Sequence, residues 1–180
     1  MIMNKIILKA TNLHWITDNP VEQTQDLCAH GFVEFKINDS SFLKPEPNID
    51  ITVSAAALFL LRTLEKSHTP VSSVCEHNLL FPCCAHSMWL INGEFTLGGC
   101  DKWFNPQVLK HNDFVMIKGA QGIEETVTAQ EWQTAVFKFA DEVKAFYDSS
   151  DAKVIPEEEL ERKGYEWFWK EWKERRMLQN

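Results

Sequence analysis

The residues best suited to chemistry in this sequence are five cysteine and histidine side chains within twelve positions: Cys75, His77, Cys83, Cys84 and His86. Thiolate and imidazole are ligands that Zn²⁺ prefers, so this Cys/His cluster is a candidate for a structural metal site. The spacings typical of zinc sites, paired C-x₂-C or H-x₃₋₅-H, are absent from the sequence. We therefore favour a core of reduced cysteines and hydrogen-bonded histidines, and we expect no cofactor.

The dipeptide Asn92-Gly93 decides which of these side chains share a face. It predicts a two-residue type I′ turn, and counting back from this turn pairs His86 with Gly99. Side chains alternate between the faces of a strand, so Cys84 and His86 share the apolar face and Cys100 points the other way. Provided that no bulge intervenes, Cys100 cannot join His86 at one metal.

A cysteine nucleophile with a histidine base is the other chemical interpretation of the thiols. Cys75 near His77 is one candidate pair, and Cys28 near His30 is another. Catalytic pairs usually come from separate elements and need a third group to orient the base, which disfavours both pairs. Local packing is the simpler explanation for Cys28. The alternative function is a small hydrolase or zinc-binding protein built around Cys83, Cys84 and His86.

The charge and the missing motifs exclude several function classes. The 180 residues include 18 basic and 26 acidic side chains, for a formal net charge of -8. Such a surface repels nucleic acid and acidic membranes, so we expect neither as a partner and expect any charged partner to be basic. No phosphate loop, nucleophile elbow, dinucleotide fingerprint or H-E-x-x-H motif is present. An enzyme is therefore the less favoured class.

Hydrophobic patterning predicts the elements that must position these residues. Alternation and turn residues indicate antiparallel strands over residues 6–8, 31–37, 88–91, 94–97, 108–111, 114–118 and 123–127. Ser54 is expected to cap a buried helix over about 54–65, and a capping box at Thr128 opens a helix over 128–148. A second C-terminal helix is expected over 156–177. The sequence predicts one α+β domain over 1–180, in which a meander sheet packs on the buried helix and two C-terminal helices.

The last predicted helix carries more aromatic rings than one buried face needs. At 100° per residue its rings cover an arc of about 200°, whereas a helix on a core needs somewhat over 100°. Either the helix is wedged between two surfaces or part of the arc is open to a partner or a second copy of the chain. The candidate partner-binding residues are Tyr165, Trp169 and Trp172 in this helix and Asp101, Trp103 and Phe104 in the loop after the hairpin.

The N-terminal residues and the cysteine count predict a cytoplasmic protein. The apolar stretch Ile6–Leu8 ends at Lys9 and is too short for an export signal. The longest apolar run, 55–61, falls far short of the roughly 20 residues that cross a bilayer. Five cysteines among apolar neighbours favour reduced thiols over a disulfide framework.

Several strings along the chain carry a family resemblance: residues 52–58, 61–65, 68–69, 80–84, 162–166 and 168–172. With these strings the chain resembles a family of small bacterial cytoplasmic proteins and is similar to immunity proteins of polymorphic toxin systems. The resemblance implies a bacterial source and carries over no catalytic residues. Together with the acidic charge it predicts a non-enzymatic protein that neutralises a basic toxin in the cytosol.

Overall fold

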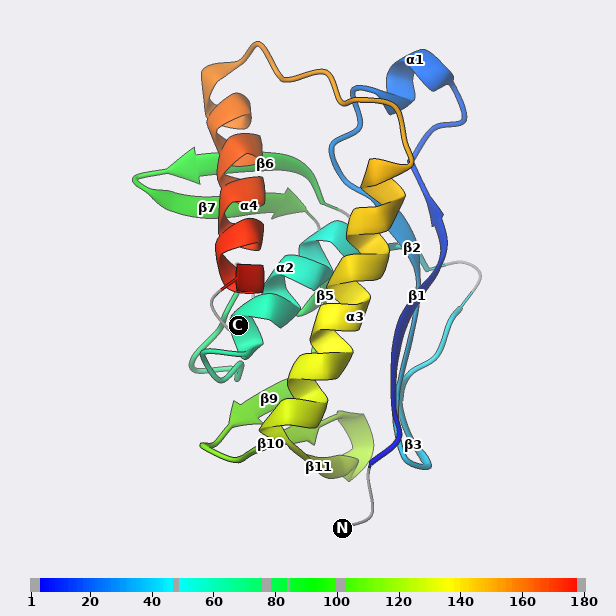
Figure 1. Cartoon of the computed structure of the whole chain (residues 1–180), viewed down its shortest axis with the longest axis vertical. Coiled ribbons are helices and arrows are strands. Elements are labelled where there is room, and N and C mark those ends of the chain that lie inside the picture. The colour runs from blue at the N-terminus through cyan, green and yellow to red at the C-terminus, as the bar shows by residue number, and fades with distance from the viewer. Residues whose placement is uncertain (1–3, 47–48, 76–78, 84, 100–102, 178–180) are drawn as a thin grey trace.

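The computed structural model describes residues 4–46, 49–75, 79–83, 85–99 and 103–177 (Figure 1). The predicted α+β class is confirmed, because helices and antiparallel strands are both abundant. The helices are α1 (Pro20–Gln23), α2 (Val53–Thr63), α3 (Ala129–Asp148) and α4 (Glu159–Met177). The strands are β1 (Ile6–His14), β2 (His30–Ile37), β3 (Ser40–Leu43), β4 (Ile51–Thr52), β5 (Phe81–Pro82), β6 (Ala85–Ile91), β7 (Glu94–Gly99), β8 (Trp103–Phe104), β9 (Gln107–Lys110), β10 (Phe114–Lys118) and β11 (Glu124–Thr128).

The described strands form four antiparallel sheets instead of the single meander expected from the sequence. The largest contains β1, β2, β3 and β4, and the next is the predicted meander of β9, β10 and β11. The hairpin β6–β7 and the short pair β5–β8 each stand alone among the described strands. Local patterning specifies which strands form a hairpin, but it contains no signal for pairing one hairpin with the next.

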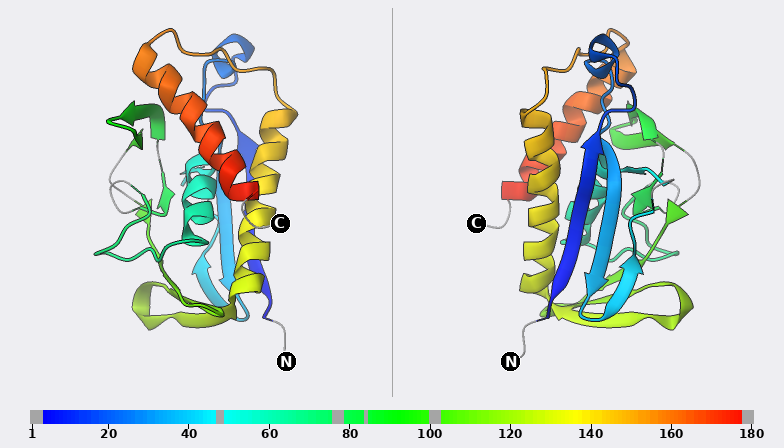
Figure 2. Two further views of the ribbon diagram at one scale, coloured as in Figure 1. Left: turned by 60° about the vertical axis from the view of Figure 1, so that its left-hand side comes forward. Right: turned by 90° about the vertical axis from the view of Figure 1, so that its right-hand side faces the viewer.

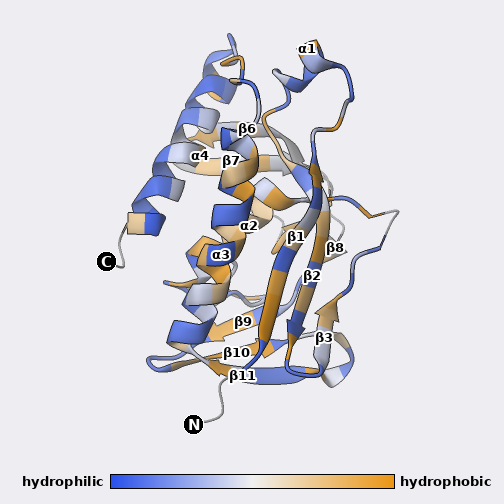
Figure 3. Cartoon of the chain, turned by 45° about the vertical axis from the view of Figure 1, so that its right-hand side comes forward, coloured by the Kyte–Doolittle hydropathy of each residue, from blue (hydrophilic) through white to orange (hydrophobic). Residues whose placement is uncertain are grey.

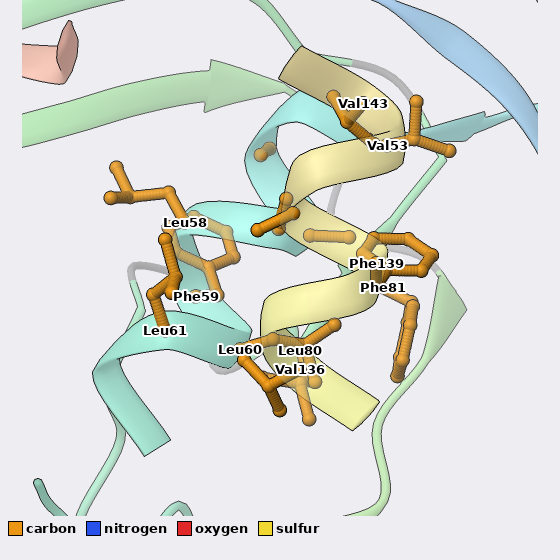
Figure 4. Packing of buried hydrophobic residues seen from close by; sticks show 14 of the residues in the cluster. Val53, Leu58, Phe59, Leu60, Leu61, Leu80, Phe81, Val136, Phe139 and Val143 are labelled. Carbon is orange, nitrogen blue, oxygen red and sulfur yellow. The ribbon is translucent and has the colours of Figure 1, made fainter. Parts of the chain in front are cut away.

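The predicted buried helix is confirmed as α2, in which all residues except Arg62 are buried. Helix α2 packs against α3, and Leu60, Val136 and Phe139 belong to the shared hydrophobic core (Figure 4). The expected cap is wrong: the N-cap position is Thr52, which makes no side-chain capping bond. Ser54 lies inside the helix, where its Oγ accepts a hydrogen bond from the backbone N–H of Ala29 at 3.2 Å.

The predicted helix over 128–148 is confirmed as α3, with Thr128 and Glu131 forming the expected capping box. Its buried stripe faces β1 and α2, and the right-hand view of Figure 2 shows α3 alongside β1. Trp132, at the start of that stripe, is fully buried. Its indole N–H donates to Thr63 Oγ1 at 3.0 Å, which ties α3 to the end of α2.

The predicted hairpin is confirmed in its turn and in the adjoining register. Asn92 and Gly93 have φ values of 53° and 83°, as a type I′ turn requires. The pairing runs as expected from Ile91 opposite Glu94 to Ser87 opposite Gly98. The register then shifts, and Ala85 pairs with Gly99.

This bulge changes the argument about the Cys/His cluster. Without a bulge His86 would oppose Gly99, whereas in the structure Ala85 occupies that position. A shift of one residue exchanges the two faces of a strand, so the predicted separation of Cys100 from His86 no longer follows from counting. Cys100 lies outside the described residues, and for His86 only the backbone is described.

The last helix, α4, begins at Glu159 rather than at Pro156 and is wedged between two surfaces. One side contacts the β6–β7 hairpin and the other faces α2 and α3 (left-hand view of Figure 2). Phe168 is fully buried between these surfaces and lies 5.9 Å from the ring of Phe95 in β7. Among the described residues, no helix has the length and apolar character needed to span a bilayer.

Candidate partner-binding surfaces and the cysteine sites

A groove of about 660 Å³ lies between α3 and α4, and four aromatic rings form its floor. The floor residues of this aromatic groove are Tyr147 of α3 and Tyr165, Trp169 and Trp172 of α4. The rings of Tyr147 and Trp169 meet edge to face, with centroids 4.9 Å apart and an interplanar angle of 88°. The structure therefore brings together all three residues that the helical spacing singled out, and it adds Tyr147.

Most of the aromatic rings in this arc of α4 are buried by packing within the molecule. Tyr165 and Trp172 are only 7% and 4% exposed, because α4 packs against both the hairpin and α2. Trp169 is half-buried. The wedged position of the helix thus accounts for much of the excess of rings, and Trp169 contributes the most accessible ring of the three candidates.

The rim of the aromatic groove carries charges of both signs that neutralise one another. Arg176 donates two hydrogen bonds to the carboxylate of Asp141, at 2.9 and 2.7 Å, and this contact raises the pKa of Arg176. Lys144 forms an ion pair with Asp148 one turn along α3. Its ammonium also lies 5.4 Å from the centroid of the Trp169 ring. The rim therefore offers polar contacts to a partner, but its charges do not create a strong electrostatic potential of one sign.

The acidic surplus is concentrated at one end of the molecule, which carries α1, segment 149–158 and the start of α4 (Figure 1). We call this region the acidic end. Its carboxylates are Asp18, Glu22, Asp26, Asp151, Glu157, Glu158, Glu159 and Glu161, and its cations are Lys153, Arg162 and Lys163. A negative potential at this end attracts basic partners and is screened by salt.

Exposed apolar side chains lie within the same acidic end. They are Ile16, Val21, Val154, Ile155 and Leu160, each at least 48% exposed. Figure 3 shows apolar colouring on α1 and on the segment that leads into α4. Segment 149–158 is held against α1, since the Val154 N–H donates to the Thr24 carbonyl at 2.8 Å. Apolar groups rimmed by charges are typical of a protein-interaction surface.

Lys153 connects the aromatic groove to the acidic end. It lines the groove and also a second hollow of about 470 Å³ beside Trp15 and Asp18. Its Nζ donates to the Gln23 carbonyl at 2.6 Å and lies 2.9 Å from the centroid of the Trp15 ring. Burial lowers the pKa of Lys153 to about 8, although the nearby carboxylates of Asp26 and Asp151 act in the opposite direction.

The second predicted surface, the loop after the hairpin, is only partly described. Asp101 lies outside the described residues, and for Trp103 the backbone alone is described. Phe104 is half-buried, with its ring centroid 5.8 Å from that of Phe81 in β5. The ring of Phe104 therefore packs over the short β5–β8 sheet, which gives it a structural role that does not require a partner.

The structure corrects the interpretation of Cys83. This residue is disulfide-bonded, so the expected reduced thiol is wrong at this position. A disulfide sulfur is neither a thiolate ligand for zinc nor a nucleophile, which removes Cys83 from both chemical interpretations. His77 and Cys84 lie outside the described residues. Within the described part of the chain, no three His, Cys, Asp or Glu side chains are placed to hold a metal ion.

The other two described cysteines carry thiols in very different surroundings. Cys28 is fully buried, and burial, followed by the charge of Asp26, raises the pKa of its thiol far above the usual range. Packing therefore explains Cys28. Cys75 lies with its Sγ 3.9 Å from Nδ1 of His68. The sequence did not predict the pair of His68 and Cys75. The two residues lie seven positions apart in a segment without a regular helix or strand, and no motif links them.

Comparison with known proteins adds no relative: the chain matches no protein-family model, no curated protein and no solved structure. Function is therefore inferred from the surfaces and contacts of this chain.

Proposed function

We propose that this protein acts by binding a basic protein partner through the aromatic groove and the adjoining acidic end. The observation that carries the proposal is the position of half-buried Trp169 in the aromatic groove, which Lys153 links to an acidic end with exposed apolar side chains. Large rings in a concave site are the usual anchors of protein interfaces. The groove offers room for an apolar or aromatic side chain of the partner.

The charge distribution supports a basic partner. The formal net charge is -8, and the acidic end carries a surplus of carboxylates while the groove rim is nearly neutral. In such an arrangement the acidic end accelerates the encounter, and the aromatic contacts slow dissociation. The two surfaces therefore have separate kinetic roles.

The resemblance to immunity proteins suggests the class of partner. We infer a bacterial toxin with a basic surface that acts in the cytosol, such as a nuclease, and we infer that binding holds it inactive. An acidic protein is suited to cover the basic surface with which such a toxin binds nucleic acid. This role requires neither a reaction nor a cofactor in the inhibitor.

Mixing and co-expression with a basic toxin, sought first among the proteins encoded beside this chain, test the proposal. We expect binding and protection by the wild-type chain, and a Kd at least about tenfold weaker for Trp169→Ala, because interface anchors contribute more than 1 kcal/mol. Trp167→Ala is the matched control, since Trp167 is a half-buried tryptophan of α4 that faces a different pocket. Absence of binding, or equal losses in both variants, would overturn the proposal.

Light scattering distinguishes a foreign partner from a second copy of the chain. We expect a monomer whose Trp169 ring remains accessible until the toxin is added. A wild-type dimer that Trp169→Ala converts to a monomer would show that the groove is occupied by another copy, and the toxin-binding proposal would fail.

A further inference from the structure

A further pocket, of about 650 Å³, lies on the side of α4 opposite the aromatic groove, and Cys75 is among its lining residues. Its lining comes from the end of α2, the segment around Ser73, the β6–β7 turn and α4. Cys75 is not disulfide-bonded, and the residue as a whole is 7% exposed. The charged residues that line this pocket are Arg62, Lys66, Glu171, Glu174 and Arg175. The thiol thus borders a polar space large enough for a small ligand.

The tautomer of His68, whose imidazole lies beside Cys75, follows from a chain of hydrogen bonds. Asn105 Oδ1 accepts the backbone N–H of Leu80 at 2.9 Å, so the amide presents its oxygen in this direction. The same oxygen lies 2.7 Å from Nε2 of His68, which must therefore carry the proton and donate it. The lone pair of His68 is then on Nδ1, the nitrogen that faces Cys75.

Among the described residues, two acceptors lie within reach of the thiol proton. Ser73 Oγ donates its hydroxyl proton to the Cys75 carbonyl at 2.6 Å, so that proton is committed. The contacts from Cys75 Sγ to Ser73 Oγ, at 3.5 Å, and to His68 Nδ1, at 3.9 Å, consequently have the thiol as donor. The Val74 N–H, 3.3 Å from Nδ1, shares the same lone pair and helps to hold the ring in place.

Burial keeps this imidazole in the form that accepts a proton. His68 is fully buried, and desolvation lowers its pKa, opposed only by the hydrogen bond to Asn105. Nδ1 of the neutral His68 faces the thiol of Cys75, and its Nε2–H is donated to the amide oxygen of Asn105. This arrangement supplies a cysteine nucleophile, a base and a group that orients the base. His68 and Cys75 lie seven residues apart in the segment between α2 and β5, and Asn105 comes from a separate part of the chain, after β8.

We propose that Cys75 is a nucleophile that accepts an acyl group from small acyl esters, with His68 as the base and Asn105 as the residue that positions it. In this step Sγ bonds to the carbonyl carbon, and the bond from that carbon to the leaving oxygen breaks. The thiol proton moves to Nδ1 of His68 and then to the leaving oxygen. The products are a thioester on Cys75, an alcohol and neutral His68. This activity is separate from the partner binding proposed above.

Acetylation of the intact protein by p-nitrophenyl acetate tests this site, with peptide mass spectrometry to locate the acetyl group. We expect the label on Cys75, while Cys28 serves as an internal control that stays unlabelled because it is fully buried. His68→Gln should slow the labelling of Cys75 by about 100-fold, the lower range for loss of a general base. Labelling of Cys28 in preference to Cys75, or no effect of His68→Gln, would overturn the proposal.

The pH profile separates a base from a merely structural histidine. With His68 as base, the wild-type rate should change little between pH 6.5 and 8, whereas an unassisted thiol gains about tenfold per pH unit below its pKa. His68→Gln should show that steep dependence. A steep wild-type profile would overturn the proposal, and this measurement needs no variant that folds.

Asn105 is tested by rescue. Asn105→Asp keeps an oxygen that can accept from His68 and Leu80, but its charge raises the pKa of His68, so labelling should reach the wild-type rate only at the upper end of the pH range, whereas Asn105→Ala should label slowly throughout. Glu124→Gln, at an exposed carboxylate of β11, should label like the wild type. Equal rates and profiles for Asn105→Ala and the wild type would exclude a positioning role.

Discussion

Gly164 of α4 lies directly against the backbone of Met88 in β6. A Cβ placed on Gly164 would stand 2.2 Å from the Met88 carbonyl oxygen and 2.6 Å from the backbone nitrogen of Trp89. Real Cβ atoms essentially never approach this closely, so only glycine allows the helix to rest on the hairpin. The contact sets the depth of α4, and with it the positions of Trp169 on one side and of the Cys75 pocket on the other.

Gly164→Ala should destabilise the protein, although alanine is the better helix former. Overpacking against backbone atoms typically costs 1–3 kcal/mol, and we expect a loss of about 2 kcal/mol in the free energy of unfolding, measured with urea. Glu166→Ala, at an exposed position of the same helix, should stay within about 0.5 kcal/mol of the wild type. Equal stabilities for the two variants would contradict the close contact.

The buried carboxylate of Glu171 should be needed for stability. It accepts two hydrogen bonds from Arg62, at 2.8 and 2.9 Å, and one from Arg175 at 2.7 Å. Burial favours the neutral form, but the hydrogen bonds and charges of Arg62 and then Arg175 outweigh it and lower the pKa of Glu171. Glu171→Gln should cost about 3 kcal/mol, as expected when one partner of a buried ion pair loses its charge.

Glu174→Gln is the matched control for this prediction, because Glu174 is an exposed carboxylate of the same helix. Its free energy of unfolding should remain within about 0.5 kcal/mol of the wild type. A Glu171→Gln variant as stable as this control would show that the ion pair is dispensable.

Glu131 should make the fold sensitive to acid. Its carboxylate accepts hydrogen bonds from the side chain and backbone of Asn4 and from the Thr128 N–H, and these lower its pKa to about 2. Because the unfolded-state pKa is near 4.5, the stabilisation is complete above that pH and disappears as the pH falls toward 2.

Urea unfolding of wild type and Glu131→Gln across this pH range measures the contribution. The gap in stability between the two proteins should be widest above pH 4.5 and should shrink as the pH falls. Glu46→Gln, at an exposed carboxylate, should follow the wild-type curve. A gap that does not change with pH would exclude the carboxylate charge as its cause.

The acidic end should govern the rate at which the partner associates. Replacing Glu157, Glu158 and Glu159 by Gln should lower the association rate at low salt by about tenfold and leave the dissociation rate nearly unchanged, because exposed charges act on the encounter. Stopped-flow mixing at several salt concentrations measures both rates. The same charge change at Asp39, Glu46 and Glu124, away from this end, should have a much smaller effect; equal effects would refute a localised role.

The sequence was a good guide wherever a short stretch of chain determines its own conformation. Asn92-Gly93 predicted the hairpin turn because few residues accept positive φ, and Thr128 with Glu131 predicted the start of α3 because both capping bonds form within one turn. The apolar run of α2 predicted a buried helix for the same local reason. The cap at Ser54 was wrong because the side chain of that serine bonds to Ala29, from a distant segment.

Packing between distant segments decided the candidate sites. Helical spacing placed Tyr165, Trp169 and Trp172 on one arc, but only the wedged position of α4 showed which ring stays accessible and added Tyr147 from α3. Cys75 and His68 lie in the segment between α2 and β5, and Asn105 reaches His68 from the segment after β8; no spacing rule predicts these contacts. Patterns along the chain encode local conformation and burial, whereas side-chain contacts across the fold arise only when the elements pack against one another.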